Sequence, residues 1–378
     1  MNILVMFAAV FALPYSTFTA CILTMINREL IRIKVVQLTY AYYQNGSNNI
    51  DNAEKELVFS LSKAYDLYHC LLALIVAVTK EERRRAEAAA HRQGANGTSL
   101  GDKFAYNKFA LQLEENHQLQ DFIATNKHTW DNSIEFVRKL CNQIEQSQVY
   151  ADYMAAADDS YDADRELWRK LYKNLITDND DLQSLLEDWS LYWNDDKDIV
   201  DTFVLKTIKR FEPRNRASQP LLPEYGDEED KDFACRLLRA TILNGDQYQR
   251  YMSEASRNWD FSRLAYMDVV IMQIAIAEML TFPNIPLSVT INEYVDLAKV
   301  YSTPRSYSYV NGMLDAIARH LISSGKLTKT IDSPRTSPHG NDNVAVDTPE
   351  TAPADSEEPQ QDTATDVDNN NNQQEDNN

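Results

Sequence analysis

The chain has 378 residues, a formal net charge of −20, nine glycines and four cysteines. This length allows two or three domains. So few glycines leave little material for phosphate-binding loops. The motifs GxxxxGK[ST], GxGxxG, HExxH and CxxC are absent from the sequence. Such an acidic protein cannot hold nucleic acid by bulk attraction and needs a local basic patch to do so.

Residues 1–24 form an apolar leader or a spurious upstream extension. No Lys or Arg precedes the apolar run, whereas a secretory signal requires one. We therefore favour an extension of the reading frame over an export signal, and expect the folded protein to begin near Met25. The four cysteines are far apart, which argues against a disulfide framework or a zinc site and fits a reducing compartment.

Residues 25–93 contain two predicted helices. The first covers 27–44, with Asn27 as its cap and Gly46 beyond its end, and Ile31, Val35, Leu38 and Tyr42 make its apolar stripe. Arg28, Arg32 and Lys34 lie off that stripe, which fits either a solvated basic face or a phosphate contact.

The second predicted helix begins at a capping box of Asp51 and Glu54 and continues into the basic run 80–85. Interleaved charges of this kind usually mark an exposed helix, although RNA contact is the alternative.

Residues 94–226 read as a helical insertion and linker. After the loop 94–101, helical spacing predicts helices over 104–125, 132–147, 164–176, 182–193 and 199–211. The aromatic residues of this segment (Trp168, Tyr172, Trp189, Tyr192 and Trp193) suit base stacking, but aromatics at helical spacing are more often core, and acidic neighbours repel phosphate. We therefore predict a core role.

Residues 227–329 contain the centre of the fold. Ten of the twelve residues after Asp268 are apolar, and only Gln273 and Glu278 interrupt them. The sequence predicts a buried helix over 268–280, capped by Asp268 and stopped by Pro283. A helix capped by Ser288 and a last helix over 308–323, with Gly325 after it, should surround it. Residues 330–378 are polar and acidic, carry no core residues, and should be disordered.

The C-terminal helices carry a series of ordered motifs: Trp259, Arg263 and Asp268, Ala277-Glu278, Ile285-Pro286, Ile291-Asn292-Glu293, Leu297-Ala298-Lys299 and Tyr309-Val310-Asn311-Gly312-Met313-Leu314-Asp315. In order and spacing this series resembles the C-terminal half of the NusB transcription antitermination factors. The resemblance implies an all-α protein, a NusB-like helical bundle with two helical halves, here carrying a large helical insertion and a disordered acidic tail.

The same resemblance implies a function and partners. The protein is expected to be cytoplasmic, to bind boxA-type RNA together with the ribosomal protein NusE, and to act in the RNA polymerase antitermination complex during rRNA transcription. No small-molecule substrate, cofactor, metal or membrane partner is expected. The alternative is a helical protein-interaction adaptor that has lost RNA binding.

Candidate RNA-binding residues follow from the resemblance at both ends of the fold. NusB proteins typically have an arginine-rich first helix that contacts RNA phosphates, which points to Arg28, Arg32 and Lys34. On the last helix Tyr309 stands where the family commonly has Phe, so it either stacks on a base or packs against neighbouring tyrosines. Arg305 replaces a commonly acidic residue and favours phosphate. Asn311 is the third candidate there, although with Gly312 it also fits helix packing.

Enzyme signals are weak. The six histidines never pair at metal-ligand spacing, and no nucleophile motif occurs. The rRNA cytosine methyltransferases carry a NusB-like domain beside a nucleotide-binding domain, but their glycine-rich cofactor loop is missing here. We therefore expect a binding protein with no catalytic residues.

Overall fold

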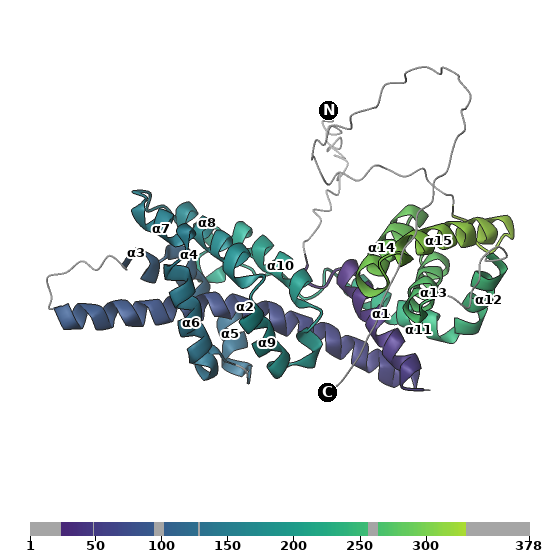
Figure 1. Cartoon of the computed structure of the whole chain (residues 1–378), viewed down its shortest axis with the longest axis horizontal. Helices are drawn as coiled ribbons and strands as arrows, with labels where there is room; N and C mark the ends of the chain where they lie inside the picture. The colour runs from purple at the N-terminus through teal and green to yellow at the C-terminus, as the bar shows by residue number, and fades with distance from the viewer. Residues whose placement is uncertain (1–23, 48, 94–101, 128, 256–263, 330–378) are drawn as a thin grey trace, which may run out of the picture. The chain divides into compact units, whose positions relative to one another are not determined.

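The computed structural model describes residues 24–47, 49–93, 102–127, 129–255 and 264–329, all within a compact unit that ends at Pro334 (Figure 1). The described residues form helices and no strand, so the predicted all-α class is confirmed. The α-helices are α1 (Arg28–Gln44), α2 (Ile50–Gln93), α3 (Asp102–Ala105), α4 (Lys108–Glu114), α5 (His117–Thr125), α6 (Ile134–Glu145), α7 (Gln148–Ala155), α8 (Tyr161–Leu171), α9 (Asp180–Trp189), α10 (Lys197–Arg210), α11 (Glu228–Leu243), α12 (Gly245–Ala255), α13 (Tyr266–Thr281), α14 (Leu287–Tyr301) and α15 (Ser306–Ser323). Several predictions fall on residues outside this description: the leader 1–23, the loop 94–101, Trp259, Arg263 and the tail 330–378.

Helix α13 is the buried centre of the C-terminal helices. Its residues from Val270 to Met279 are all buried, and it packs on α1, α11, α12, α14 and α15. A helix that is apolar on every side is stable in water only when neighbours surround it. The predicted core helix is therefore confirmed.

Two predicted caps are wrong, because other residues begin these helices. Helix α13 starts at Tyr266, so Asp268 lies inside its first turn. The Asp268 carboxylate instead accepts hydrogen bonds from Ser302 Oγ at 2.5 Å and Ser306 Oγ at 2.9 Å, which fastens the α14–α15 connection to α13. Helix α14 already begins at Leu287, after Pro286, so Ser288 does not cap it.

The N-terminal helices begin at asparagine caps. Asn27 Oδ1 accepts from the Leu30 amide at 2.9 Å, and Gly46 follows α1 with φ of 59°, as predicted. For α2, Asn49 Oδ1 accepts from the Asn52 amide, and Asp51 pairs with Arg239 instead of capping.

Helix α2 has 44 residues, ends where the insertion begins, and packs against helices of both the NusB-like half and the insertion. It packs on α1 and α11, and also on α3, α4, α5, α6 and α10. Among the described helices, only α2 is long and apolar enough to cross a membrane, and 72% of its apolar window is buried inside the protein. The apolar run thus forms the shared core of two groups of helices.

The insertion is helical, with breaks that periodicity did not reveal. The predicted helix over 104–125 is divided into α3, α4 and α5, because Asn107 and Asn116 each cap a new helix with their side-chain oxygens. Helix α7 begins at the Ser147 cap and was not predicted. Trp168, Tyr172 and Trp193 are buried, which confirms their core role.

Candidate nucleic-acid interface

Arg28 lies at the first turn of α1 and keeps 37% of its side chain exposed. Its guanidinium donates to Glu229 at 3.1 Å and Asp230 at 3.4 Å, both in the first turn of α11, and stands 5.1 Å from the centre of the Phe233 ring. The cation is thus reachable from solvent but shared with two carboxylates. A phosphate would have to compete with them.

Arg32 is part of the core, contrary to the expectation of a solvent-facing cation. It donates from Nε to Glu278 Oε2 at 2.8 Å and from Nη2 to Glu278 Oε1 at 3.0 Å, and Nη1 reaches Glu293 at 3.1 Å. Burial alone would lower the pKa of Arg32, but the hydrogen bonds and charge of Glu278 outweigh it and raise that pKa above its usual value. The arginine joins α1 to α13 and α14.

Lys34 is also buried, beneath a corner of the insertion. Its Nζ lies 2.7 Å from Asp196 Oδ1 and donates to the Tyr192 carbonyl at 3.3 Å, and both charged side chains are 4% exposed or less. One turn along α1, Gln37 donates to Asp195 at 3.1 Å. Asp195 and Asp196 therefore occupy the face of α1 where Lys34 was expected to contact RNA phosphates.

The candidates on α15 are placed differently. Arg305 precedes the helix and is exposed, as is Asn311, while Tyr309 is half-buried and packs against the core. Burial raises the pKa of Tyr309, and the nearby Asp268 charge adds to the effect. A Cβ at Gly312 would meet no atom within 4 Å, so no described helix approaches there. Arg305 and Asn311 are therefore exposed at the start of α15, but Tyr309 and Asn311, two residues apart, point to different sides of the helix.

A pair of exposed tyrosines was missed from the sequence. Tyr40 at the end of α1 and Tyr266 at the start of α13 have ring centroids 5.7 Å apart, with 36% and 45% of each residue exposed. Tyr40 stands off the apolar stripe of α1, which is the signal that would have identified it.

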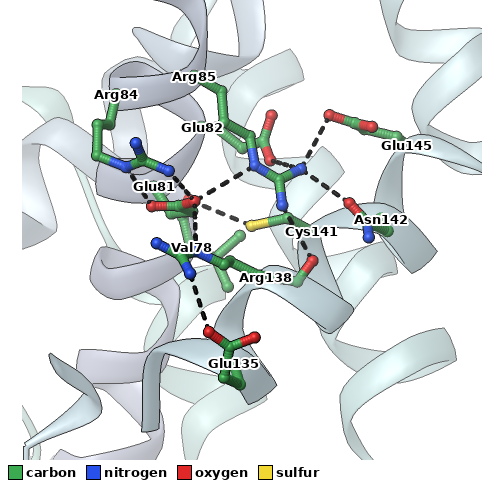
Figure 2. Close-up of polar contacts among 10 residues, drawn as sticks. All are labelled: Val78, Glu81, Glu82, Arg84, Arg85, Glu135, Arg138, Cys141, Asn142 and Glu145. Carbon is green, nitrogen blue, oxygen red and sulfur yellow. Dashed lines mark hydrogen bonds and ion pairs between the residues drawn. The ribbon is translucent and has the colours of Figure 1, made fainter. Parts of the chain in front are cut away.

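The basic run 80–85 is held by carboxylates, and Figure 2 shows the contacts of Arg84 and Arg85. Arg83 reaches Glu114 at 2.8 Å, Arg84 reaches Glu81 at 2.6 Å, and Arg85 lies 3.2 Å from Glu82. Hydrogen bonds from Arg84 lower the pKa of Glu81 to about 2, whereas burial raises the pKa of Glu82 to about 7. The run connects α2 to α4 and α6, so its cations are not a free RNA surface.

Replacing both Lys34 with Met and Asp196 with Asn tests the corner that covers α1. Burial raises the pKa of Asp196 to about 6. The stability that the protein gains from protonating Asp196 is therefore complete below about pH 4 and is lost as pH rises through 6. Wild type should therefore become less stable between pH 4 and 6, whereas the double variant should not show this decrease. At pH 7 it should melt well above the single variant Lys34→Met, since the asparagine amide leaves no unpaired charge in the buried site.

Melting temperatures at pH 4–7 check this expectation. The single variant Lys34→Met is the control, because it leaves a buried carboxylate without its cation and should melt well below wild type. Unchanged melting of Lys34→Met would show that the insertion corner does not cover α1.

Comparison with known proteins relates the chain to one family. A model of the NusB family matches residues 202–319. Three curated proteins with the name Transcription antitermination protein NusB are similar to this chain. The protein of Chloroherpeton thalassium is 36% identical over 123 residues, which are 32% of this chain and 58% of that protein, and the protein of Salinibacter ruber is 36% identical over 109 residues, which are 29% of this chain and 68% of that protein. The protein of Geotalea daltonii is 34% identical over 132 residues, which are 35% of this chain and 88% of that protein. No solved structure matches the chain.

The matched region agrees with the described fold. It begins inside α10, so the last part of the expected insertion is matched as well, and it ends in α15. The chain is similar to 58% of the Chloroherpeton protein's length but to most of the other two. With this family match and these relatives, the chain belongs to the NusB family, whose curated relatives are named transcription antitermination proteins.

Proposed function

We propose that this protein binds boxA-type RNA together with the ribosomal protein NusE and supports antitermination during rRNA transcription in the cytoplasm. Family membership supports the general role. The observation that supports the RNA contact is the exposure of Arg305 and Asn311 at the start of α15, where Tyr309 is half-buried. Arg28 adds a partly exposed cation from α1.

Each proposed residue has a distinct role. Arg28 and Arg305 neutralise phosphates, which fixes the position of the strand without reading its sequence. Tyr309 stacks on a base and Asn311 hydrogen-bonds to a base edge, as in single-stranded RNA recognition. Arg32 and Lys34 contribute indirectly, because they hold α1 against α13, α14 and the insertion.

The second candidate function is a helical adaptor that binds protein but no RNA. The burial of Arg32 and Lys34 and the net charge of −20 favour it, since both weaken attraction to phosphate. Fluorescence anisotropy with boxA-like RNA, with and without NusE, separates the two functions. If the full-length protein binds this RNA no better than a scrambled control, the adaptor takes the place of the RNA-binding function.

Tyr309→Ala should weaken RNA binding by roughly ten- to a hundred-fold. Base–aromatic stacking is worth about 1–3 kcal/mol per base and depends little on salt, so the slope of affinity against salt should stay as in wild type. The measurement is anisotropy at two salt concentrations with NusE present.

A matched control is Tyr106→Ala, which removes a tyrosine that is 47% exposed on the insertion. It should leave RNA affinity unchanged. Equal affinities of Tyr309→Ala and wild type would remove Tyr309 from the RNA site.

A further inference from the structure

Five exposed cations of α8, the turn that follows it and α10 form no ion pair with a described carboxylate. They are Lys170 and Lys173, at the end of α8 and in the following turn, and Lys206, Lys209 and Arg210 on α10, and all five are exposed. We name them the insertion cation surface. They contrast with the basic run of α2, whose arginines each pair with a described glutamate.

The two helices that carry these cations pack side by side in opposite directions. Tyr172 Oη donates to Asp201 Oδ1 at 2.5 Å, and Arg165 donates to the Phe211 carbonyl at 2.7 Å, so the end of one helix lies beside the start of the other. Lys206, Lys209 and Arg210 follow the three- and four-residue spacing of one helix face.

Glu166 on α8 is a carboxylate on which charges from both helices act. The hydrogen bond from Arg169 is the main cause that lowers the pKa of Glu166, and the charges of Lys170 and Lys209 act on the same carboxylate. Arg169 holds Glu166 at 2.6 Å, so this acid is already neutralised. The surface therefore keeps an excess of positive charge in a chain of net charge −20.

Helix stability explains only part of this cluster. Lys170, Lys209 and Arg210 lie in the last turns of their helices, where a cation contributes about 0.3–1 kcal/mol through the helix dipole. Lys206 lies one turn earlier, with its ammonium 4.7 Å from the centre of the buried Phe203 ring. Three cations along one face of α10 exceed what a helix end requires.

We propose that the insertion cation surface binds the phosphate backbone of RNA that flanks the recognition element. This rests on the proposed function. Phosphate contacts need cations and no apolar partner, whereas a protein interface needs an apolar centre. Among the described residues, none of the exposed large hydrophobic side chains lies on α8 or α10, which favours RNA over an acidic protein.

The position of α10 supports a continuous path for the strand. Asp196, directly before α10, contacts Lys34 of α1. Fourteen residues at about 1.5 Å each carry Arg210 roughly 20 Å from that contact. Gln37 links Asp195, just before α10, to Tyr301 at the end of α14, so RNA bound at the start of α15 would need only a short flanking segment to reach α10.

The test compares two RNAs and two triple variants. One RNA contains the boxA-like element alone, and the other extends it by about ten nucleotides at each end, within the usual size of a single-strand site. The test variant is Lys206→Gln with Lys209→Gln and Arg210→Gln. The control variant removes three exposed lysines elsewhere, Lys55→Gln with Lys127→Gln and Lys326→Gln. Affinities are measured over a range of salt concentrations with NusE present.

Wild type should bind the long RNA more tightly than the short RNA. The test variant should lose this advantage, with a salt slope lower by about 2, because three phosphate contacts to a single strand contribute about 0.7 each. Its affinity for the short RNA should not change, and the control variant should match wild type on both. Lys206→Arg with Lys209→Arg keeps the charges and should keep the tighter binding.

Three outcomes overturn the proposal, and each is distinct. Equal binding of the two RNAs by wild type removes the flanking contact while leaving the proposed function intact. Unchanged long-RNA binding by the test variant shows that the insertion cation surface does not contact the flanking RNA. Absence of binding to either RNA removes the proposed function together with this inference.

Discussion

Arg32→Ala should destabilise the protein by about 3–5 kcal/mol, because it leaves Glu278 buried without its cation. Glu278 has no exposed surface, and its remaining hydrogen-bond donors are the hydroxyl groups of Thr290 at 2.8 Å and Tyr294 at 2.9 Å; the charge of Lys329 acts on it as well. These neutral donors cannot replace a bidentate guanidinium. Urea denaturation followed by circular dichroism measures the change.

The matched control for Arg32 is Arg28→Ala, one helical turn away on α1. Arg28 is 37% exposed and pairs with partly exposed carboxylates, so its loss should cost less than about 1 kcal/mol. A stable Arg32→Ala protein that no longer binds RNA would restore Arg32 to the RNA surface and contradict its structural role.

Ile274→Asp should unfold at least the helices around α13. Ile274 has no exposed surface, and the described residues beside it on α13 are buried and mainly apolar, so a carboxylate there has no cation to pair with. Burying an unpaired charge is among the few single changes that cost more than about 4–5 kcal/mol. Thermal melting by circular dichroism gives the result.

Tyr266→Asp is the control on the same helix. Tyr266 is 45% exposed at the first position of α13, where an acidic residue interacts favourably with the helix dipole. This variant should melt near wild type. If Ile274→Asp melted like Tyr266→Asp, α13 would not be the centre of the fold.

Local sequence signals predicted the parts of the fold that depend on neighbours along the chain. The apolar run of α13, the Asn27 cap and the positive φ at Gly46 and Gly325 all follow from residues within one or two turns. The predicted Asp268 cap of α13 was wrong because the capping rule considers only neighbouring residues. Asp268 is bound by hydroxyl groups of Ser302 and Ser306, more than thirty residues later in the chain, which no capping rule considers.

The candidate RNA-binding residues show the same difference between local and long-range effects. Arg305 and Asn311 are exposed as expected, because helical spacing on α15 separates them from its apolar residues. Arg32 and Lys34 also stand off an apolar stripe, yet each is buried against a carboxylate distant in sequence, Glu278 and Asp196. A single helix shows which residues are polar, but not which polar residues a later segment will cover.

The continuous helix α2 has a consequence for synthesis. Its apolar residues between Leu57 and Val78 leave the ribosome before α6, α10 and α11, which cover them in the folded protein. At about 5–20 residues per second, those covering helices are complete roughly 10–30 s later. During this interval the nascent chain exposes an apolar surface long enough to cross a membrane, so we expect its yield to depend on chaperones that shield emerging polypeptides.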